Sequence, residues 1–284
     1  MKIILSRKGF DSKYGGIPNL IMPNGDLVFL PIPELNSGMS YSNLIYGNST
    51  YEKILKDLRY NYQDTSTHQV VWDCHLDPDI DHNKLNIKPS KAIFGQCDQA
   101  AGHLINHNVT KGDVFLFFGT FRNVEIKLDG AYHYVKKDKE KHIVFGYLEV
   151  DEVINKKEDI LRDYHWHPHS KPFYINKTNN TLFTSCKHLF DTERPGHGVF
   201  SFSDDLILTE DNMSKSKWKP KHILTTTENM TYHKNANKGL FFQSARIGQE
   251  FIIDDLNNNK IKSWIIKQVC KKSDYETTRE ETKS

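Results

Sequence analysis

Short apolar runs, each ended within a few residues by glycine, proline, asparagine or aspartate, recur along the whole chain. The two most apolar runs are residues 114–118 and 142–150, and both are much shorter than the roughly 18 residues of a membrane-spanning helix. Short apolar runs between turn residues are typical of buried β-strands. We therefore expect a chain built mainly from short strands.

Helical spacing of apolar residues occurs in two segments. Ile54, Leu55 and Leu58 share one face of a helix expected over residues 51–60, and a second helix is expected over residues 99–106. Further strands are expected at residues 2–5, 26–31, 68–72, 181–185, 198–202, 206–208, 239–242, 250–253 and 261–266. This pattern predicts an α+β fold with mostly short strands and two to four helices.

The predicted organisation is one catalytic or nucleotide-binding domain over residues 1–270, followed by a polar, disordered tail over residues 271–284. The four cysteines are widely spaced and form no CxxC motif, which indicates reduced thiols in a cytoplasmic protein. The N-terminus contains no signal-peptide pattern, and we expect no contact with a membrane.

The charges nearly balance, with 38 Lys or Arg against 36 Asp or Glu and a net charge of +2. This balance excludes a polybasic protein that binds a polyanion through bulk charge, and 12% aromatic residues exclude a disordered chain. Four of the seven arginines lie in polar segments: Arg7 and Arg122 in two of those described below, Arg194 beside the glycine-histidine motif of residues 196–198, and Arg246 four residues before Glu250. Their placement favours a focused anion site of nucleotide size over a long nucleic-acid track.

The first polar segment, residues 6–16 (SRKGFDSKYGG), follows a predicted strand and ends in two glycines. Glycines allow backbone N–H groups to turn toward an anion, and Arg7 and Lys8 add positive charge, so the segment suits a phosphate. It is not a P-loop, because GxxxxGK[ST] is absent. A tight surface turn with solvated charges is the alternative interpretation.

The second segment, residues 73–82, alternates carboxylates and imidazoles. An extended backbone would project Asp73, His75, Asp77 and Asp79 to one side, where they could hold a divalent metal or supply a general base. The spacing matches no defined metal motif, and an exposed loop rich in Asx turns remains an alternative.

The third segment comprises residues 95–103 and 112–122. His103 lies in a helix that starts with small residues, which permits close approach of a ligand. Arg122 follows a buried strand and is placed to bind a phosphate or carboxylate with its guanidinium. An ordinary exposed arginine is the alternative.

The fourth segment, residues 165–169 (HWHPH), contains three histidines at alternate positions. They could share one face of an extended segment as metal ligands, or Trp166, His167 and His169 could stack on and hydrogen-bond to a substrate. Pro168 argues against a helix here.

The fifth segment contains Glu250 at the start of a late predicted strand. A glutamate in this position could bind a ribose hydroxyl or stabilise an oxocarbenium-like centre, although a charge at a strand edge is the simpler interpretation.

Taken together, these motifs resemble the third nucleotide modification associated domain family. The resemblance is carried by the N-terminal SRKGFDSKYGG, by residues 75–79 (HLDPD), by residues 112–122, by residues 145–150 (FGYLEV) and by residues 249–251 (QEF), and it spans about residues 1–255. It implies a link to phage and bacterial systems that install or respond to modified nucleobases. It also marks the strongest site candidates, which are Arg7, Lys8, Asp11, Tyr14, Gly15 and Gly16, followed by His75, Asp77, Arg122 and Glu250.

The favoured hypothesis is an enzyme that acts on a nucleotide or a nucleic-acid base, including one in DNA, by glycosyl or group transfer or by hydrolysis. The expected catalytic residues are Asp11, His75, Asp77 and Glu250. The expected substrate- or phosphate-binding residues are Arg7, Lys8, Tyr14, Gly15, Gly16, His103, Arg122, His167 and His169. The sequence assigns no cofactor, no metal and no oligomeric state.

Two other hypotheses stay open at this point. A non-catalytic module could recognise a modified base by stacking it on aromatic side chains such as Tyr14 or Trp166. A structural or interaction protein with charged loops would show no buried polar site.

Overall fold

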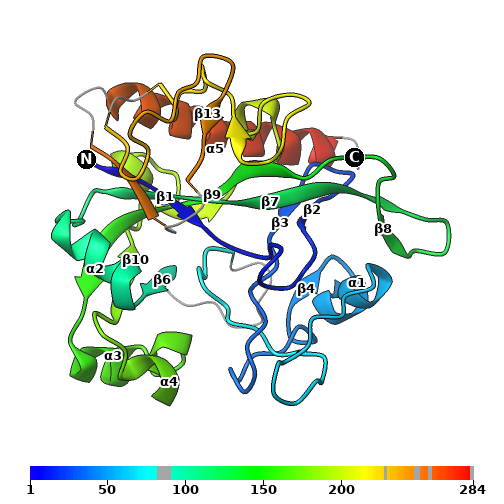
Figure 1. Cartoon of the computed structure of the whole chain (residues 1–284), viewed down its shortest axis with the longest axis horizontal. Coiled ribbons are helices and arrows are strands. Elements are labelled where there is room, and N and C mark those ends of the chain that lie inside the picture. The colour runs from blue at the N-terminus through cyan, green and yellow to red at the C-terminus, as the bar shows by residue number, and fades with distance from the viewer. Residues whose placement is uncertain (82–90, 227–228, 246–249, 255–257, 282–284) are drawn as a thin grey trace.

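A curled sheet of ten strands forms the centre of the protein in the computed structural model, which describes residues 1–81, 91–226, 229–245, 250–254 and 258–281 (Figure 1). The main path of the sheet runs in the order β14 (Glu250–Ile253), β1 (Ile3–Arg7), β7 (Val114–Ile126), β9 (Lys141–Ile154), β10 (Thr181–Ser185) and β6 (Ile93–Gln96). β1 is parallel to β7, and the other neighbours on this path are antiparallel.

The remaining strands are short. β2 (Asn19–Ile21), β3 (Leu27–Val28), β8 (Tyr132–Tyr134) and β11 (His197–Val199) attach to the main sheet. β4 (Ile45–Tyr46) with β5 (Ser49–Thr50), and β12 (Lys217–Trp218) with β13 (Phe242–Gln243), form separate two-stranded sheets. This confirms the predicted α+β fold with mostly short strands.

The described residues form five α-helices, whereas the sequence predicted two to four. They are α1 (Tyr51–Asp57), α2 (Asp98–Asn106), α3 (Lys157–Asp163), α4 (Pro172–Ile175) and α5 (Asn258–Glu281), and three short 3-10 helices, η2 (Pro168–Ser170), η3 (Leu189–Asp191) and η4 (Asp204–Leu206), lie between them. α4 has only four residues, and α3 buries a single apolar residue, Ile160, so neither shows an amphipathic repeat. Figure 1 shows α5 above the sheet and the other four helices below or beside it.

The predicted strand at residues 261–266 is wrong, because this segment lies in α5. The buried apolar residues of α5 are Ile261, Ile265 and Val269, which are spaced by four and so lie on one face of a helix. α5 continues into residues 271–281, the segment for which the sequence predicted a disordered tail. Three other predicted strands also differ. Residues 68–72 form only an isolated bridge at Val70, residues 206–208 begin in η4, and of residues 239–242 only Phe242 lies in a strand, β13.

β7 and β9 are the longest strands, and they form the centre of the core. Both are covered on two faces, which explains why their sequences are nearly continuous apolar runs. The glycine inside β9, Gly146, is required by packing: a Cβ there would lie 2.4 Å from Ile80 Cδ1 and 3.0 Å from the Gly198 carbonyl oxygen of β11.

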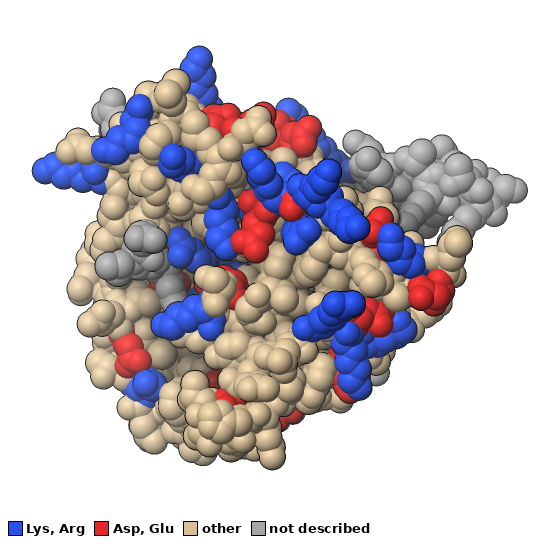
Figure 2. Space-filling model, turned by 45° about the vertical axis from the view of Figure 1, so that its right-hand side comes forward, with Lys and Arg blue, Asp and Glu red and all other residues tan. Residues whose placement is uncertain are grey.

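Positive and negative side chains are interspersed over the face shown in Figure 2, which agrees with the near-zero net charge. Within the described residues, no helix has both the length and the apolar character needed to span a membrane.

Candidate functional site

The two end strands of the main sheet path, β6 and β14, meet because the sheet is curled. The Gln96 side chain of β6 donates a hydrogen bond of 2.6 Å from Nε2 to Oε1 of Glu250, the first residue of β14. The preceding residue, Gly95, donates its backbone N–H to Asp77 Oδ1 at 2.8 Å. We call this place the β6–β14 seam, and two buried polar clusters meet there.

The histidine cluster comprises His75, Asp77, His167 and His169, each with at most 8% of its surface exposed. Nε2 of His75 lies 3.7 Å from Asp77 Oδ2, and Nε2 of His169 lies 3.9 Å from the same oxygen. Nε2 of His167 lies 3.7 Å from the other oxygen, Oδ1. The three imidazoles therefore surround one carboxylate. The cluster brings together residues from the second and the fourth of the polar segments singled out in the sequence.

Backbone hydrogen bonds fix the two segments that supply this cluster. The His75 N–H donates to Ile32 and the Asp79 N–H to Ile93, both at 2.9 Å, so residues 75–79 are anchored between two neighbouring stretches of chain. The HWHPH segment ends in the 3-10 helix η2, where His167 Nδ1 accepts the His169 N–H at 3.2 Å. Pro168 is the first residue of that turn, and the extended conformation expected from the sequence is therefore wrong.

Outer residues orient two of the rings. His75 Nδ1 lies 2.9 Å from Glu34 Oε2, and His169 Nδ1 lies 2.7 Å from Asn180 Oδ1. Tyr174 donates its hydroxyl to the other oxygen of Glu34, and its ring stacks on His169 with centroids 4.7 Å apart. These contacts hold each ring with Nε2 toward Asp77.

The electrostatics follow from burial and mutual contact. Burial by itself raises the pKa of Asp77, but His167 and His75 outweigh it and lower the pKa, so Asp77 is a carboxylate. Burial disfavours a charge on His75, yet Asp77 and Glu34 raise its pKa to about 9. Burial dominates at His169 and lowers its pKa to about 3.

Gly95 leaves the space in which the His169 ring lies. A Cβ on Gly95 would stand 2.4 Å from Cδ2 and 2.7 Å from Nε2 of that ring, which is closer than atoms can pack. The same residue donates to Asp77, so one position of β6 sets both the carboxylate and an imidazole.

The glutamate cluster lies on the other side of the seam. Because Ser6 of β1 is the register partner of Glu250, its hydroxyl donates to Glu250 Oε1 at 3.2 Å, and Lys8 Nζ lies 3.5 Å from the same oxygen. Oε1 thus faces three donors including Gln96, whereas Oε2 is buried and has no hydrogen-bond partner among the described residues. Glu250 is 1% exposed.

Arg7 extends the positive charge beside this cluster. Its guanidinium donates to the Ala245 carbonyl at 3.0 Å and lies 5.6 Å from the centre of the Phe118 ring. Burial lowers the pKa of Arg7, while Asp11 and Glu250 act in the opposite direction. Its Nε is buried without a hydrogen-bond partner in the part of the chain that the structure describes.

The glycine-rich loop after β1 is held mainly by its own hydrogen bonds. Asp11 Oδ1 accepts the N–H groups of Lys13 and Tyr14 at 2.7 and 2.9 Å, so this carboxylate shapes a turn. Gly15 has a φ of +86° and packs against the Phe10 ring. A residue with a Cβ would be strained at this φ, and its Cβ would collide with the ring. The backbone N–H groups already bonded within the protein are those of Lys8, Phe10, Asp11, Lys13, Tyr14 and Gly16. The loop therefore offers few N–H groups to a phosphate.

Two predicted binding residues lie away from the seam contacts. Arg122 is further along β7, where it donates to the Val135 carbonyl at 2.8 Å and lies over the Tyr134 ring. His103 on α2 contacts Thr231 at 3.2 Å, and its ring packs at a tilt against the rings of His107 and Tyr232.

The acidic neighbours of His75 and Asp77 have different surroundings from each other. Asp73 accepts the backbone N–H of Asn36 at 3.2 Å, outside the cluster. Asp79 is buried, and burial together with Asp77 and Asp81 raises its pKa to about 7. His82 and Arg246 lie outside the described residues.

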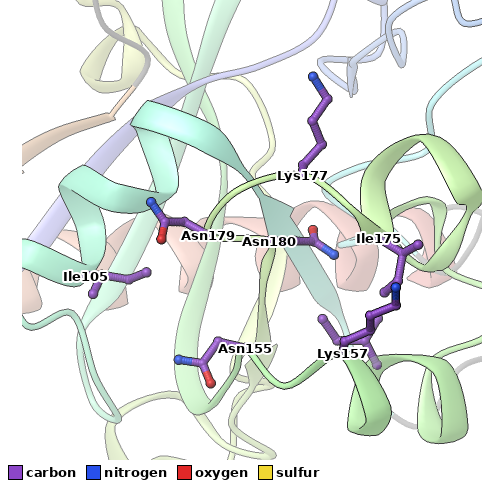
Figure 3. A pocket seen from close by; sticks show the side chains of 8 residues that line it. Ile105, Asn155, Lys157, Ile175, Lys177, Asn179 and Asn180 are labelled. Atoms are coloured by element: carbon purple, nitrogen blue, oxygen red, sulfur yellow. The ribbon is translucent and has the colours of Figure 1, made fainter.

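A cavity of about 310 Å³ adjoins the histidine cluster through Asn180. Figure 3 shows Ile105 of α2 on one side and Ile175 of α4 and Lys157 of α3 on the other, with Asn179 and Asn180 between them. Asn180 therefore lines a polar cavity and also holds His169.

Sequence reasoning missed five residues that orient these clusters. They are Ser6, Glu34, Gln96, Tyr174 and Asn180. Ser6 and Gln96 lie inside motifs that the sequence singled out, whereas Glu34, Tyr174 and Asn180 follow no recognisable pattern.

The fold and the seam define a class of protein: an α+β domain that buries histidine, carboxylate and cationic side chains where a curled sheet brings its two ends together. The family model described as nucleotide modification associated domain 3 matches residues 2–254. The chain therefore belongs to this family, as its motifs predicted. Neither a curated protein nor a solved structure matches the chain.

Proposed function

We propose that the protein is an enzyme that acts on a nucleotide or on a base in nucleic acid, DNA included, and that both clusters at the β6–β14 seam belong to one active site. The observation that carries this proposal is Glu250, a buried carboxylate. One of its oxygens accepts from Ser6 and Gln96 and pairs with Lys8, and the other has no hydrogen-bond partner among the described residues. Buried polar atoms are normally paired, and exceptions concentrate at functional sites.

Glu250 suits glycosyl or group transfer, or hydrolysis. Ser6, Gln96 and Lys8 hold Oε1, so the carboxylate keeps a fixed direction. Oε2 is then available to accept a proton or to stabilise positive charge on a sugar, which builds up when an N-glycosidic bond breaks.

Lys8 and Arg7 suit the phosphate of such a substrate. Lys8 Nζ lies 4.4 Å from the centre of the Phe94 ring as well as beside Glu250, so it joins the loop after β1 to β6. Arg7 adds a second cation near Glu250 and lies over the Phe118 ring of β7. Two cations beside a carboxylate favour a nucleotide-sized anion, and membership of a nucleotide modification family supports that choice.

The test is mass spectrometry of nucleotides, NAD and base-modified DNA incubated with purified protein. We expect a product with the wild-type chain, and a rate at least about 100-fold lower with Glu250→Gln, which keeps the shape but removes the charge. Glu152→Gln, an exposed glutamate on β9, is the matched control and should retain the rate. A product rate unchanged by Glu250→Gln would overturn the role of Glu250.

A second candidate function is recognition of a modified base without catalysis. Two exposed aromatic residues favour it: Trp166 is 50% exposed and Phe173 is 66% exposed, and they adjoin His167 and Tyr174 in the chain. Such rings can stack on a base that is flipped out of a nucleic-acid double helix. If Trp166→Ala and Phe173→Ala abolish nucleic-acid binding while Glu250→Gln changes neither binding nor biological effect, the recognition function is supported instead.

A further inference from the structure

The geometry points to a metal site: we propose that His75, Asp77 and His169 bind one divalent first-row transition-metal ion. Their candidate ligand atoms all lie within 4.8 Å of one another, and all three residues are buried. The inference concerns binding and stands without the proposed function. If both hold, the ion belongs to the active site at the seam.

The two oxygens of Asp77 have different surroundings. Oδ1 accepts the Gly95 N–H at 2.8 Å and faces His167. Oδ2 is approached by the Nε2 atoms of both His75 and His169, at 3.7 and 3.9 Å. Ligand atoms at about 2.0–2.2 Å from one tetrahedral ion lie about 3.3–3.6 Å apart, so these three atoms, all within 4.8 Å of one another, would move closer together when they bind an ion.

The outer hydrogen bonds turn one ring nitrogen of each histidine inward. Glu34 is a carboxylate and can only accept, so His75 donates from Nδ1, and Nε2, directed toward Asp77, is the nitrogen that would bind an ion after losing any proton that it carries. The amide of Asn180 donates from Nδ2 to the His169 carbonyl at 3.0 Å, which leaves Oδ1 to accept from His169 Nδ1. Metal-binding histidines characteristically donate their other N–H to an oxygen in this way.

His167 has the opposite tautomer and is excluded as a ligand. Its Nδ1 accepts the His169 N–H, so the proton of the neutral ring is on Nε2, which is directed toward Asp77 Oδ1 at 3.7 Å. This Nε2 is buried and has no hydrogen-bond partner among the described residues. It is placed to donate to Asp77 or to an oxygen atom bound by the ion.

The donor set selects the kind of ion. Two imidazole nitrogens and one carboxylate oxygen suit zinc, manganese, iron(II) or cobalt(II), whereas calcium and magnesium prefer oxygen ligands alone. Three protein ligands leave coordination positions open, which is the arrangement of catalytic sites and not of closed structural ones.

The test is metal content and binding, measured on untagged, full-length protein. We expect about one equivalent of zinc, manganese, iron or cobalt in the wild-type chain after loading and dialysis, measured by mass spectrometry of the elements. His75→Ala and His169→Ala should each weaken binding at least about 100-fold by calorimetry, because each removes a ligand. His165→Ala is the matched control, since this exposed histidine of the same segment lies outside the cluster, and it should bind as tightly as wild type.

His167→Gln distinguishes this non-ligand histidine from the two proposed ligands, because the variant should keep its affinity for the metal ion within about tenfold of wild type. Anomalous scattering from wild-type crystals soaked with zinc locates the ion even if a variant fails to fold. Wild-type protein that binds none of the four ions, equal affinity in His169→Ala, or an ion bound away from Asp77 would each overturn the proposal. Metal binding without any nucleotide product would leave the metal site standing and count against the proposed function alone.

Discussion

Gly95 shows at the residue scale how the seam depends on the absence of a side chain. Its N–H orients Asp77, and its missing Cβ leaves room for His169. A sequence shows such a glycine only as a small residue in a strand, so its role could not be predicted, whereas His75, Asp77, His167 and His169 were candidates because of their chemistry.

We predict that Gly95→Ala displaces the His169 ring. The new methyl group would lie 2.4 Å from the ring, and such overpacking costs about 1–3 kcal/mol of unfolding free energy. Denaturant unfolding measures this loss. Gly102→Ala is the control, because its Cβ would meet only the end of the Asn179 side chain at 3.0 Å and the change favours helix α2. Equal stability of the two variants would contradict the packing role of Gly95.

A buried histidine away from the seam makes stability depend on pH. His142 Nδ1 accepts the indole N–H of Trp218 at 3.0 Å, and burial lowers the pKa of His142 well below 6.5. Below pH 6.5 the unfolded chain takes up a proton that the folded protein does not, so the free energy of unfolding falls as the pH drops, by up to about 1.4 kcal/mol per pH unit.

We predict that His142→Asn makes the slope of unfolding free energy against pH shallower, because the asparagine amide oxygen can accept from Trp218 without titrating. The slope should fall by at most the equivalent of one proton taken up on unfolding. Urea unfolding of both proteins between about pH 7 and pH 5 gives the two slopes. The same slope in wild type and variant would show that His142 is not the titrating group.

At the scale of elements, one asparagine joins three stretches of chain. Asn19 Oδ1 accepts the N–H groups of Phe10 and Leu30, and Nδ2 donates to the carbonyls of Phe10 and Thr120. From the start of β2, this side chain thereby connects the loop after β1, the segment after β3 and the middle of β7. The sequence predicted this loop as a phosphate-binding element, but the asparagine that holds it lies outside the motif.

We predict that Asn19→Ala destabilises the protein by about 2–4 kcal/mol, because four hydrogen bonds of a fully buried side chain are lost. Thermal and denaturant unfolding measure the change. Asn24→Ala, which removes an exposed amide bonded to Asp26 and Tyr46, should stay within about 0.5 kcal/mol of wild type. A loss at Asn19 no larger than at Asn24 would refute the connecting role.

The elements themselves were largely predictable where their periodicity was clear. β10 has the expected bounds of residues 181–185, and α1 and α2 lie within one residue of their predicted starts. α5 was missed over residues 261–266, because an apolar run of that length fits a strand as well as a helix and only the spacing of the buried residues decides.

At the scale of the whole molecule, the site exists because the sheet curls. Glu250 and Gln96 are on opposite ends of the main path of strands, yet their side chains are hydrogen-bonded at 2.6 Å. Composition and motifs supplied the chemistry of the candidate residues. The contact between the end strands depends on strand order and register, which local patterns do not encode.

The central claim is that the histidine cluster and Glu250 act on the same substrate. The most direct test is a double-mutant cycle of kcat/KM for nucleotide turnover with Asp77→Asn, Glu250→Gln and the double variant. Residues of one site act as a unit, so we predict that the double variant is no more than about tenfold slower than the slower single variant. The account would be contradicted if the fold-loss of kcat/KM in the double variant equalled the product of the two single fold-losses. Full activity in either single variant would also contradict it.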